Sequence, residues 1–203
     1  NEAWMAMKRM LARPVDAREL PKVLGAIKRE TALIRGAFYG TMLRNEIFDF
    51  AQLGTFVERA DNTARIIDVK YYVLLPSLSW VGSTLDNYQW ESILRSVAAY
   101  RSYGWVYEGE YKPANIADFL ILNNRMPRSL AFCYRNIAES LNFLAAEYGP
   151  RHGCHDIVET TLGKIKGNTI ERIFDIGLHE FLSDFIVENN RLGNEIARDY
   201  RFY

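Results

Sequence analysis

The charged side chains between residues 58 and 68 are the part of this sequence best suited to chemistry. They are Glu58, Arg59, Asp61, Arg65 and Asp68. A carboxylate beside a guanidinium group is suited to moving a proton or, with the guanidinium as a clamp, to holding an anion. Glu58 or Asp61 would then act as the acid or base, and Arg59 or Arg65 would bind the anionic group. In a helix, Asp61, Arg65 and Asp68 would share one face.

The same charges have two other interpretations. Ile66 and Ile67 lie among them and Val69 follows the last of them, and a helix that is apolar nearly all round is expected to be packed on several sides. A buried charge needs a partner, because a stranded charge is strongly destabilising. The charges would then form a structural network of ion pairs between helices. A third interpretation is a solvated face, and the sequence leaves all three open.

Three arginines outside this segment lie where a helix dipole disfavours them. Arg125 and Arg128 flank Pro127 at the start of a predicted helix, and Arg44 comes just before another. The positive end of the helix dipole opposes cations at such positions. We therefore expect a compensating negative group, either a carboxylate of the 58–68 segment or a bound anion.

Residues 151–155 place two histidines and a cysteine close together. Zinc binds such side chains, here His152, Cys154 and His155. No second cluster lies near them, so we interpret the segment as a polar helix N-terminus and predict no metal site. A thiol near a helix start often has a lowered pKa, which would apply to Cys154. Cys133 lies in an apolar helix and is predicted to be in the core.

The sequence contains no pattern of a known cofactor site. Neither a phosphate-binding loop nor a dinucleotide fingerprint is present, and metalloprotease, EF-hand and nucleophile-elbow patterns are also missing. We predict no cofactor. The aromatic residues Trp105, Tyr107 and Tyr111 lie in a predicted connection over residues 104–112. They would either stack on a ligand or pack this connection onto the core.

Helices are the elements that must position these side chains. Apolar residues alternate at steps of three and four through the charged segment, which is the pattern of a helix that buries one stripe. The stripe consists of Phe50, Leu53, Val57, Ala60, Ala64, Ile67, Tyr71 and Leu74. Asn45 is placed to cap this central helix and Pro76 to end it.

The remaining elements are also predicted to be helices, from their apolar period and from the Pro and Gly residues at their ends. They cover residues 2–11, 20–38, 86–103, 113–122, 129–148, 154–165 and 169 to the C-terminus. Strand-type alternation is scarce. We therefore predict an all-α fold, a single helical bundle of about seven to eight helices around the long central helix, forming one domain over residues 1–203.

The composition excludes several classes of protein. The 25 basic and 25 acidic residues cancel, which argues against nucleic acid or an anionic membrane as a partner. No apolar run approaches the roughly 20 residues of a membrane span. Two cysteines form no disulfide framework, which is typical of the cytoplasm. The chain begins with Asn1, and we expect an upstream portion to precede it. The sequence does not indicate an oligomeric state.

Several segments together resemble the bacterial Alpha-E family, a group of helical domains named for their helices and a Glu-Arg motif. The segments are Thr41-Met42-Leu43-Arg44, Leu53-Gly54, Glu58-Arg59-Ala60-Asp61, Asp68-Val69, Pro127-Arg128-Ser129-Leu130 and Leu178-His179-Glu180-Phe181. The resemblance covers nearly the whole chain, and the combination is specific. It implies that the chain corresponds to the C-terminal part of the family's length. The motif positions carried over are Arg44, Glu58, Arg59, Asp61, Arg65, Asp68 and Arg128.

The resemblance implies partners rather than a reaction. Family members are found beside a circularly permuted ATP-grasp-type protein and beside transglutaminase-like or protease-like proteins. This association implies a role as an accessory or binding module that partners an ATP-grasp-type carboxylate–amine ligase in peptide or amide bond formation. The alternative is an enzyme in its own right, acting on a small anionic or peptide substrate through the Glu-Arg helix. Whether the chain is an enzyme stays open.

Overall fold

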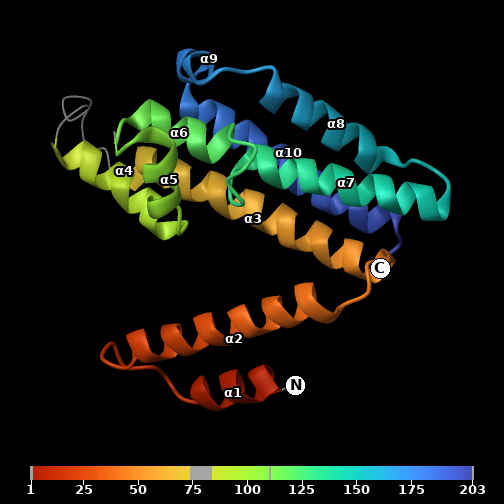
Figure 1. The fold of residues 1–203 in the computed structure, drawn as a ribbon, viewed down its shortest axis with the longest axis horizontal. Helices are drawn as coiled ribbons and strands as arrows, with labels where there is room; N and C mark the ends of the chain where they lie inside the picture. Colours follow the sequence, from red (N-terminus) through yellow and green to blue (C-terminus); the bar gives the residue numbers. More distant parts are fainter. Residues whose placement is uncertain (1, 74–83, 110, 203) are drawn as a thin grey trace. The chain divides into compact units, whose positions relative to one another are not determined.

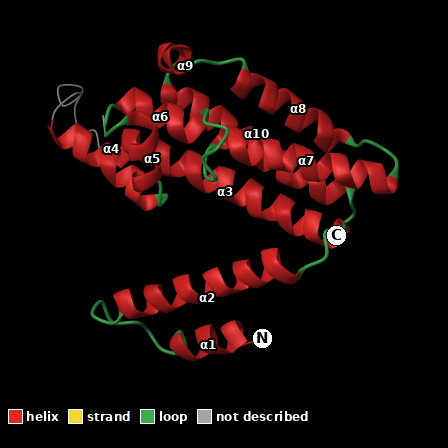
Figure 2. Ribbon diagram, in the orientation of Figure 1, coloured by secondary structure: helices red, strands yellow, loops and turns green. Residues whose placement is uncertain are grey.

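The computed structural model describes residues 2–73, 84–109 and 111–202 (Figure 1). Every element in these ranges is a helix or a loop, so the all-α prediction is confirmed (Figure 2). The described residues form ten helices, α1 to α10, which is more than the sequence predicts because two of the predicted helices are broken. No helix in this part of the chain is long and apolar enough to cross a membrane.

The chain divides into two compact units, Asn1–Phe48 and Asp49–Tyr203. The N-terminal unit is a helical hairpin of α1 (Glu2–Met10) and α2 (Leu20–Thr41). Pro21 lies in the first turn of α2, where its missing N–H has no helical partner to lose. The hairpin is too small to bury much of its apolar surface, and α1 buries no side chain completely.

The central helix α3 (Glu46–Val73) lies where the sequence predicts it. Asn45 caps it, because the backbone N–H of Phe48 donates to the Asn45 side-chain oxygen at 3.3 Å. The predicted stop at Pro76 lies outside the described residues. The buried side chains of α3 in the C-terminal unit are Leu53, Phe56, Ala60, Thr63, Ala64, Ile67 and Lys70. Leu53, Ala60, Ala64 and Ile67 belong to the predicted stripe. Phe56, Thr63 and Lys70 form a second row beside it, so α3 is packed on two adjacent sides.

The predicted helix over residues 86–103 is wrong in one respect, because the structure divides it in two. Its parts are α4 (Thr84–Ser96) and α5 (Tyr100–Tyr107). Between them Ala98 has a φ of 55°, a left-handed conformation that interrupts an α-helix. Sequence periodicity does not reveal such a break, because apolar residues continue through it.

Helix α5 also replaces part of the predicted connection over residues 104–112, because Tyr103 and Tyr107 pack inward. Tyr103 is fully buried and stacks on Tyr107, with ring centres 4.8 Å apart. The hydroxyl of Tyr107 donates to the carboxylate of Asp118. These contacts fix the rotation of α5 about its own axis, which determines the direction of its other side chains.

The last predicted helix is likewise two helices, α9 (Ile170–Ile176) and α10 (Leu178–Asp199). Gly177 separates them with a φ of 109°, which L-residues with side chains rarely adopt. A Cβ at this position would also collide with the carboxylate of Glu180. The prediction of one continuous helix is wrong here, because the glycine ends α9 instead of continuing it.

The core lies in the C-terminal unit. Its remaining helices are α6 (Pro113–Ile121), α7 (Leu130–Tyr148) and α8 (Gly153–Lys166). A buried amide joins three helices: the hydroxyl of Tyr134 on α7 donates to Asn189 on α10, and Asn189 donates to the carbonyl of Val57 on α3, each at 3.1 Å. Because each polar atom has a partner, this bridge is compatible with burial.

A buried ion pair joins α3 to α4. Lys70 is 1% exposed, and its Nζ lies 2.5 Å from a carboxylate oxygen of Asp86, which is 4% exposed. The same Nζ donates to the side-chain oxygen of Gln89 at 2.5 Å. The ring of Trp90 lies 5.9 Å from it. An ion pair this deep is sensitive to the loss of either partner, because the other charge would stay buried alone.

We expect Lys70→Ala to lower the free energy of unfolding by about 3–5 kcal/mol, because it leaves the Asp86 carboxylate unpaired. The double change Lys70→Met with Asp86→Leu removes both charges and is expected to cost less. Arg95→Gln, which removes an exposed pair with Glu91, serves as the control. Urea unfolding measures all three, and a Lys70→Ala loss no larger than that of the control would contradict the expectation.

Candidate functional site

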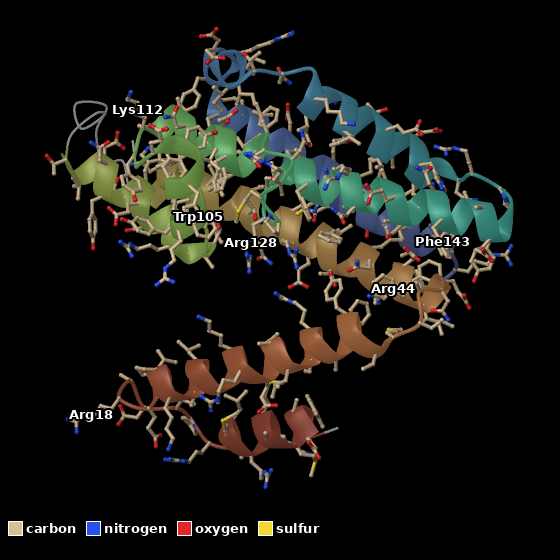
Figure 3. The ribbon with its side chains drawn as sticks, in the orientation of Figure 1. Arg18, Arg44, Trp105, Lys112, Arg128 and Phe143 are labelled. Carbon is tan, nitrogen blue, oxygen red and sulfur yellow. The ribbon has the colours of Figure 1, made fainter. Side chains whose placement is uncertain are left out.

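The two residues of the Glu-Arg pair point in different directions from α3. Successive residues of a helix are about 100° apart around its axis. Glu58 lies on the exposed side with Arg65, whereas Arg59 is half-buried and reaches the connection between α6 and α7. Arg128, on the same connection, is labelled in Figure 3. The pair is therefore not one chemical unit but two side chains with separate surroundings.

Arg59 joins α3 to the connection before α7. Its Nη1 donates to the carbonyl oxygen of Pro127 at 3.1 Å, and its guanidinium carbon lies 4.9 Å from the centre of the Phe56 ring. Burial raises the pKa of the nearby Cys133 thiol to about 12, against the opposing effect of the positive charges of Arg59 and Arg128. The positive charges of Arg59 and Arg128 therefore both lie near the start of α7.

The connection over residues 122–129 is held in shape by Asn123 and Ser129. The side-chain oxygen of Asn123 accepts hydrogen bonds from the backbone N–H groups of Arg125 at 2.8 Å and Met126 at 3.0 Å. The Ser129 hydroxyl donates to the Asn123 carbonyl and accepts from a backbone N–H in the first turn of α7. This geometry fixes the backbone from which Arg125 extends.

A cavity of 360 Å³ lies between α5, α6 and this connection. Its lining includes Ser102, Trp105, Phe119, Asn123, Arg125 and Pro127. Trp105 is 83% exposed, the highest value among the large apolar side chains that the structure describes. Of the two interpretations of the aromatic segment, packing onto the core holds for Tyr107 and Tyr111. Trp105 instead stands beside the cavity.

Asp61 and Arg65 form a pair along the surface of α3. The Arg65 Nε lies 2.7 Å from Asp61 Oδ2, and the Arg65 side chain is 53% exposed. The hydrogen bond to Asp61, together with the charges of Asp61 and then Asp68, raises the pKa of Arg65 against a smaller effect of burial. Such exposed pairs contribute little to stability.

Asp68 pairs with a histidine of α10. The Asp68 carboxylate lies 2.6 Å from His179 Nδ1, and the two side chains are 16% and 26% exposed. This hydrogen bond, with the Asp68 charge, raises the pKa of His179, against a smaller effect of burial. The Ser183 hydroxyl lies 3.5 Å from both ring nitrogens. A serine activated by a histidine would lie in hydrogen-bond range of one ring nitrogen, whereas this hydroxyl is equally far from both and at the limit of that range.

Arg44 belongs to the N-terminal unit and bonds to backbone. Its guanidinium donates to the carbonyl oxygens of Tyr39 at 2.6 Å and Met42 at 3.1 Å, and its carbon lies 4.0 Å from the centre of the Phe48 ring. These are contacts with backbone carbonyls and an aromatic ring, and the compensating carboxylate or bound anion that the sequence predicts for Arg44 stays a prediction.

The predicted charges thus fall into three groups. The first is Arg44 in the N-terminal unit. The second is Arg59, Arg125 and Arg128 beside the 122–129 connection, and among the described residues Arg125 has no ion pair with a carboxylate. The third is Asp61, Arg65 and Asp68 along α3 with His179. Glu58 stays exposed to solvent.

Sequence reasoning did not find the partner of Asp68 or the Lys70–Asp86 pair. His179 lies far from Asp68 in the chain, and no local spacing connects them. Lys70 had a usable signal, because it follows Ile67 by three residues and so belongs to the buried side of the helix. A lysine at such a position predicts a buried acidic partner.

The segment with two histidines and a cysteine is structural. His155 is buried, and its ring nitrogens contact the carbonyl oxygen of Leu141 at 3.0 Å and the backbone of His152. The thiol of Cys154 does not have the lowered pKa considered for it, because burial and the carboxylate of Asp199 raise its pKa to about 12. Cys133 is buried, as predicted. No cluster suited to a metal occurs among the residues searched, those that the structure describes.

Comparison with known proteins supplies a family. A family model described as Alpha-E, "a predicted alpha-helical domain with a conserved ER motif", matches residues 1–201. The match is therefore not confined to one part of the chain. No curated protein and no solved structure matches the chain.

The Asp68–His179 pair predicts a pH dependence of stability. The folded pKa of His179 lies above its unfolded value, so the pair's contribution is complete below about pH 6.5 and is lost as the pH rises through the folded pKa. We expect the urea midpoint to fall between pH 6 and pH 9 by more in the native chain than in His179→Gln. An equal pH slope in the native chain and in His179→Gln would contradict the assignment.

Proposed function

The chain belongs to the Alpha-E family, and on that premise we propose that it is a binding module. Its partner in this proposal is an ATP-grasp-type carboxylate–amine ligase, with a transglutaminase-like protein as a second partner. The module would act in the cytoplasm, in peptide or amide bond formation. No nucleotide-binding pattern occurs in its own sequence, so the ligase would supply the ATP chemistry.

The observation that carries the proposal is an apolar stripe on α2. It consists of Leu20, Leu24, Ile27, Ile34 and Phe38, which follow at steps of three, four or seven and so share one side of the helix. Leu24 and Ile34 are 54% and 52% exposed. Full burial of an apolar side chain of this size contributes about 1.5–3 kcal/mol relative to leaving it in water.

Helix α1 does not cover this stripe, because it packs against a different side of α2. The cavity between α1 and α2 is lined by Val23 and Ala26, and Ala26 is the buried residue of α2. Within the N-terminal unit, α1 thus leaves Leu20, Leu24, Ile27 and Ile34 uncovered, while Phe38 at the end of the stripe stacks on Phe48. A contiguous apolar surface of this kind marks a protein interaction site more often than chance exposure does.

The charged residues of α3 also support a module rather than an enzyme. Asp61 is paired with Arg65 and Asp68 with His179, while Arg59 is bonded to a backbone carbonyl. A catalytic carboxylate usually opens into a pocket with a group positioned to exchange protons. The 360 Å³ cavity favours the alternative function, an enzyme acting on a small anionic or peptide substrate, but Arg125 rather than an acid of α3 lines it.

We expect the double change Leu24→Glu with Ile34→Glu to abolish co-purification with the ATP-grasp-type protein, because it places charges in the apolar stripe. Leu33→Glu is the matched control. Leu33 is 67% exposed but lies on another side of α2. The melting temperature of all variants should stay near the native value. Undiminished co-purification of the double variant would contradict the proposal. So would a native chain that is a dimer and a double variant that is a monomer in light scattering, because the apolar stripe would then bind a second copy of this chain.

A second pair of variants tests the charges of α3. Arg59→Ala is expected to cost about 1.5–3 kcal/mol of stability, because a charged hydrogen bond to Pro127 is lost. Arg65→Ala should cost at most about 1 kcal/mol, since its pair is exposed. Both should still bind the partner when folded. Loss of partner binding in a folded Arg59 variant would instead identify the Glu-Arg helix as the surface that binds the partner.

A further inference from the structure

The geometry of the 360 Å³ cavity points to a binding site for a carboxylate that carries an aromatic or large apolar side chain, as at the C-terminal residue of a peptide. The cavity adjoins Arg59 of the Glu-Arg helix through Pro127. The inference rests on the proposed function only for the origin of such a ligand, which would be the acid substrate or the product of an amide-forming ligase. The site itself follows from the residues of α5, α6 and the 122–129 connection.

The position of Trp105 is enforced by the rest of α5. Tyr103 and Tyr107 pack α5 against α6 through their stacked rings and the bond from Tyr107 to Asp118. Trp105 lies two residues from each of them, about 200° around the helix axis, so it must face away from that contact. An indole is large and apolar, and it is usually buried at least in part. One held at 83% exposure beside a cavity is a platform for stacking.

Arg125 supplies the charge on the same cavity. Its backbone is fixed by the hydrogen bond to Asn123, and its exposed side chain has no ion pair with a carboxylate among the described residues. A guanidinium binds a carboxylate through two parallel hydrogen bonds. A phosphate dianion usually requires further cations on the cavity wall, and Arg125 is the cation of this lining. The lining therefore fits a singly charged carboxylate better.

The remaining lining residues suit the other parts of such a ligand. Phe119 and Met126 are 2% and 6% exposed and form an apolar floor. Ser102 and Asn123 place a hydroxyl and an amide beside it, and these groups are suited to the peptide bond that precedes the terminal carboxylate. An aromatic side chain would lie over this floor, with Trp105 at the rim of the cavity.

The test uses the whole chain without any partner, so its failure is distinct from failure of the docking proposal on α2. The probe is N-acetyl-L-phenylalanine, and the readout is a nitrogen-15 NMR titration that follows the indole N–H of Trp105 and the backbone N–H groups of Asn123 and Arg125. We expect saturable shifts, with the primary amide of the probe and N-acetylglycine each binding about tenfold or more weakly, since one lost contact of this kind is worth about a factor of ten.

Two variants locate the contacts. Trp105→Ala and Arg125→Gln should each weaken binding about tenfold, with the remaining NMR signals unchanged because both side chains are exposed. In Arg125→Gln the acid and its amide should bind equally, which a merely structural role of Arg125 would not produce. Arg101→Gln, an exposed arginine of α5 that does not line the cavity, is the matched control and should bind like the native chain.

Titrations with further ligands distinguish a peptide from a free amino acid as the source of the carboxylate. If the tripeptide Ala-Ala-Phe binds at least as tightly as the acetylated residue, the ligand is a peptide C-terminus. If free phenylalanine binds more tightly than both, it is an amino acid, and the peptide assignment is overturned. Equal affinity of the native chain for the acid and its amide, no saturable shift of Trp105, or tighter binding of phenyl phosphate would each overturn the carboxylate site.

Discussion

Helix α3 is enclosed by its neighbours on two adjacent sides, and the charged residues between 58 and 68 occupy the strip that is left. Glu58 and Arg65 lie on the open side, while Arg59 and Asp68 lie at its two borders. A charge at the border of a buried surface needs a partner on the neighbouring element, because water reaches only part of it. Arg59 finds a carbonyl of the α6–α7 connection and Asp68 finds His179 of α10. Arg59 and Asp68 thereby attach α3 to two different neighbours, the α6–α7 connection and α10.

Asp61 and Asp68 are paired along the surface of α3, whereas the cavity is lined by residues from α5, α6 and the connection that Arg59 holds. Arg59 bonds to the carbonyl of Pro127, a residue of the lining, and is not itself part of the lining. The cavity for which we propose a ligand is therefore separate from the charges of α3 and adjoins them through this one hydrogen bond. The apolar stripe of α2 is a separate feature, suited to a protein and not to a small molecule.

Much of the fold could be predicted from the sequence, because apolar periodicity reports helices directly. The stripe of α3 and the cap at Asn45 are examples. The breaks at Ala98 and Gly177 could not, because one depends on tertiary packing and the other on a backbone angle that many glycines do not use. For the site, spacing correctly joined Asp61 to Arg65. It could not join Asp68 to His179 or place Trp105 and Arg125 on one cavity, since both depend on how distant segments pack.

The buried pair of Lys70 and Asp86 joins α3 to α4 away from water. The attraction between two charges grows as water is excluded from around them, and dissolved ions screen a buried pair much less than an exposed one. Added salt should therefore weaken the exposed pair of Asp61 and Arg65 while leaving this link between the two helices largely intact.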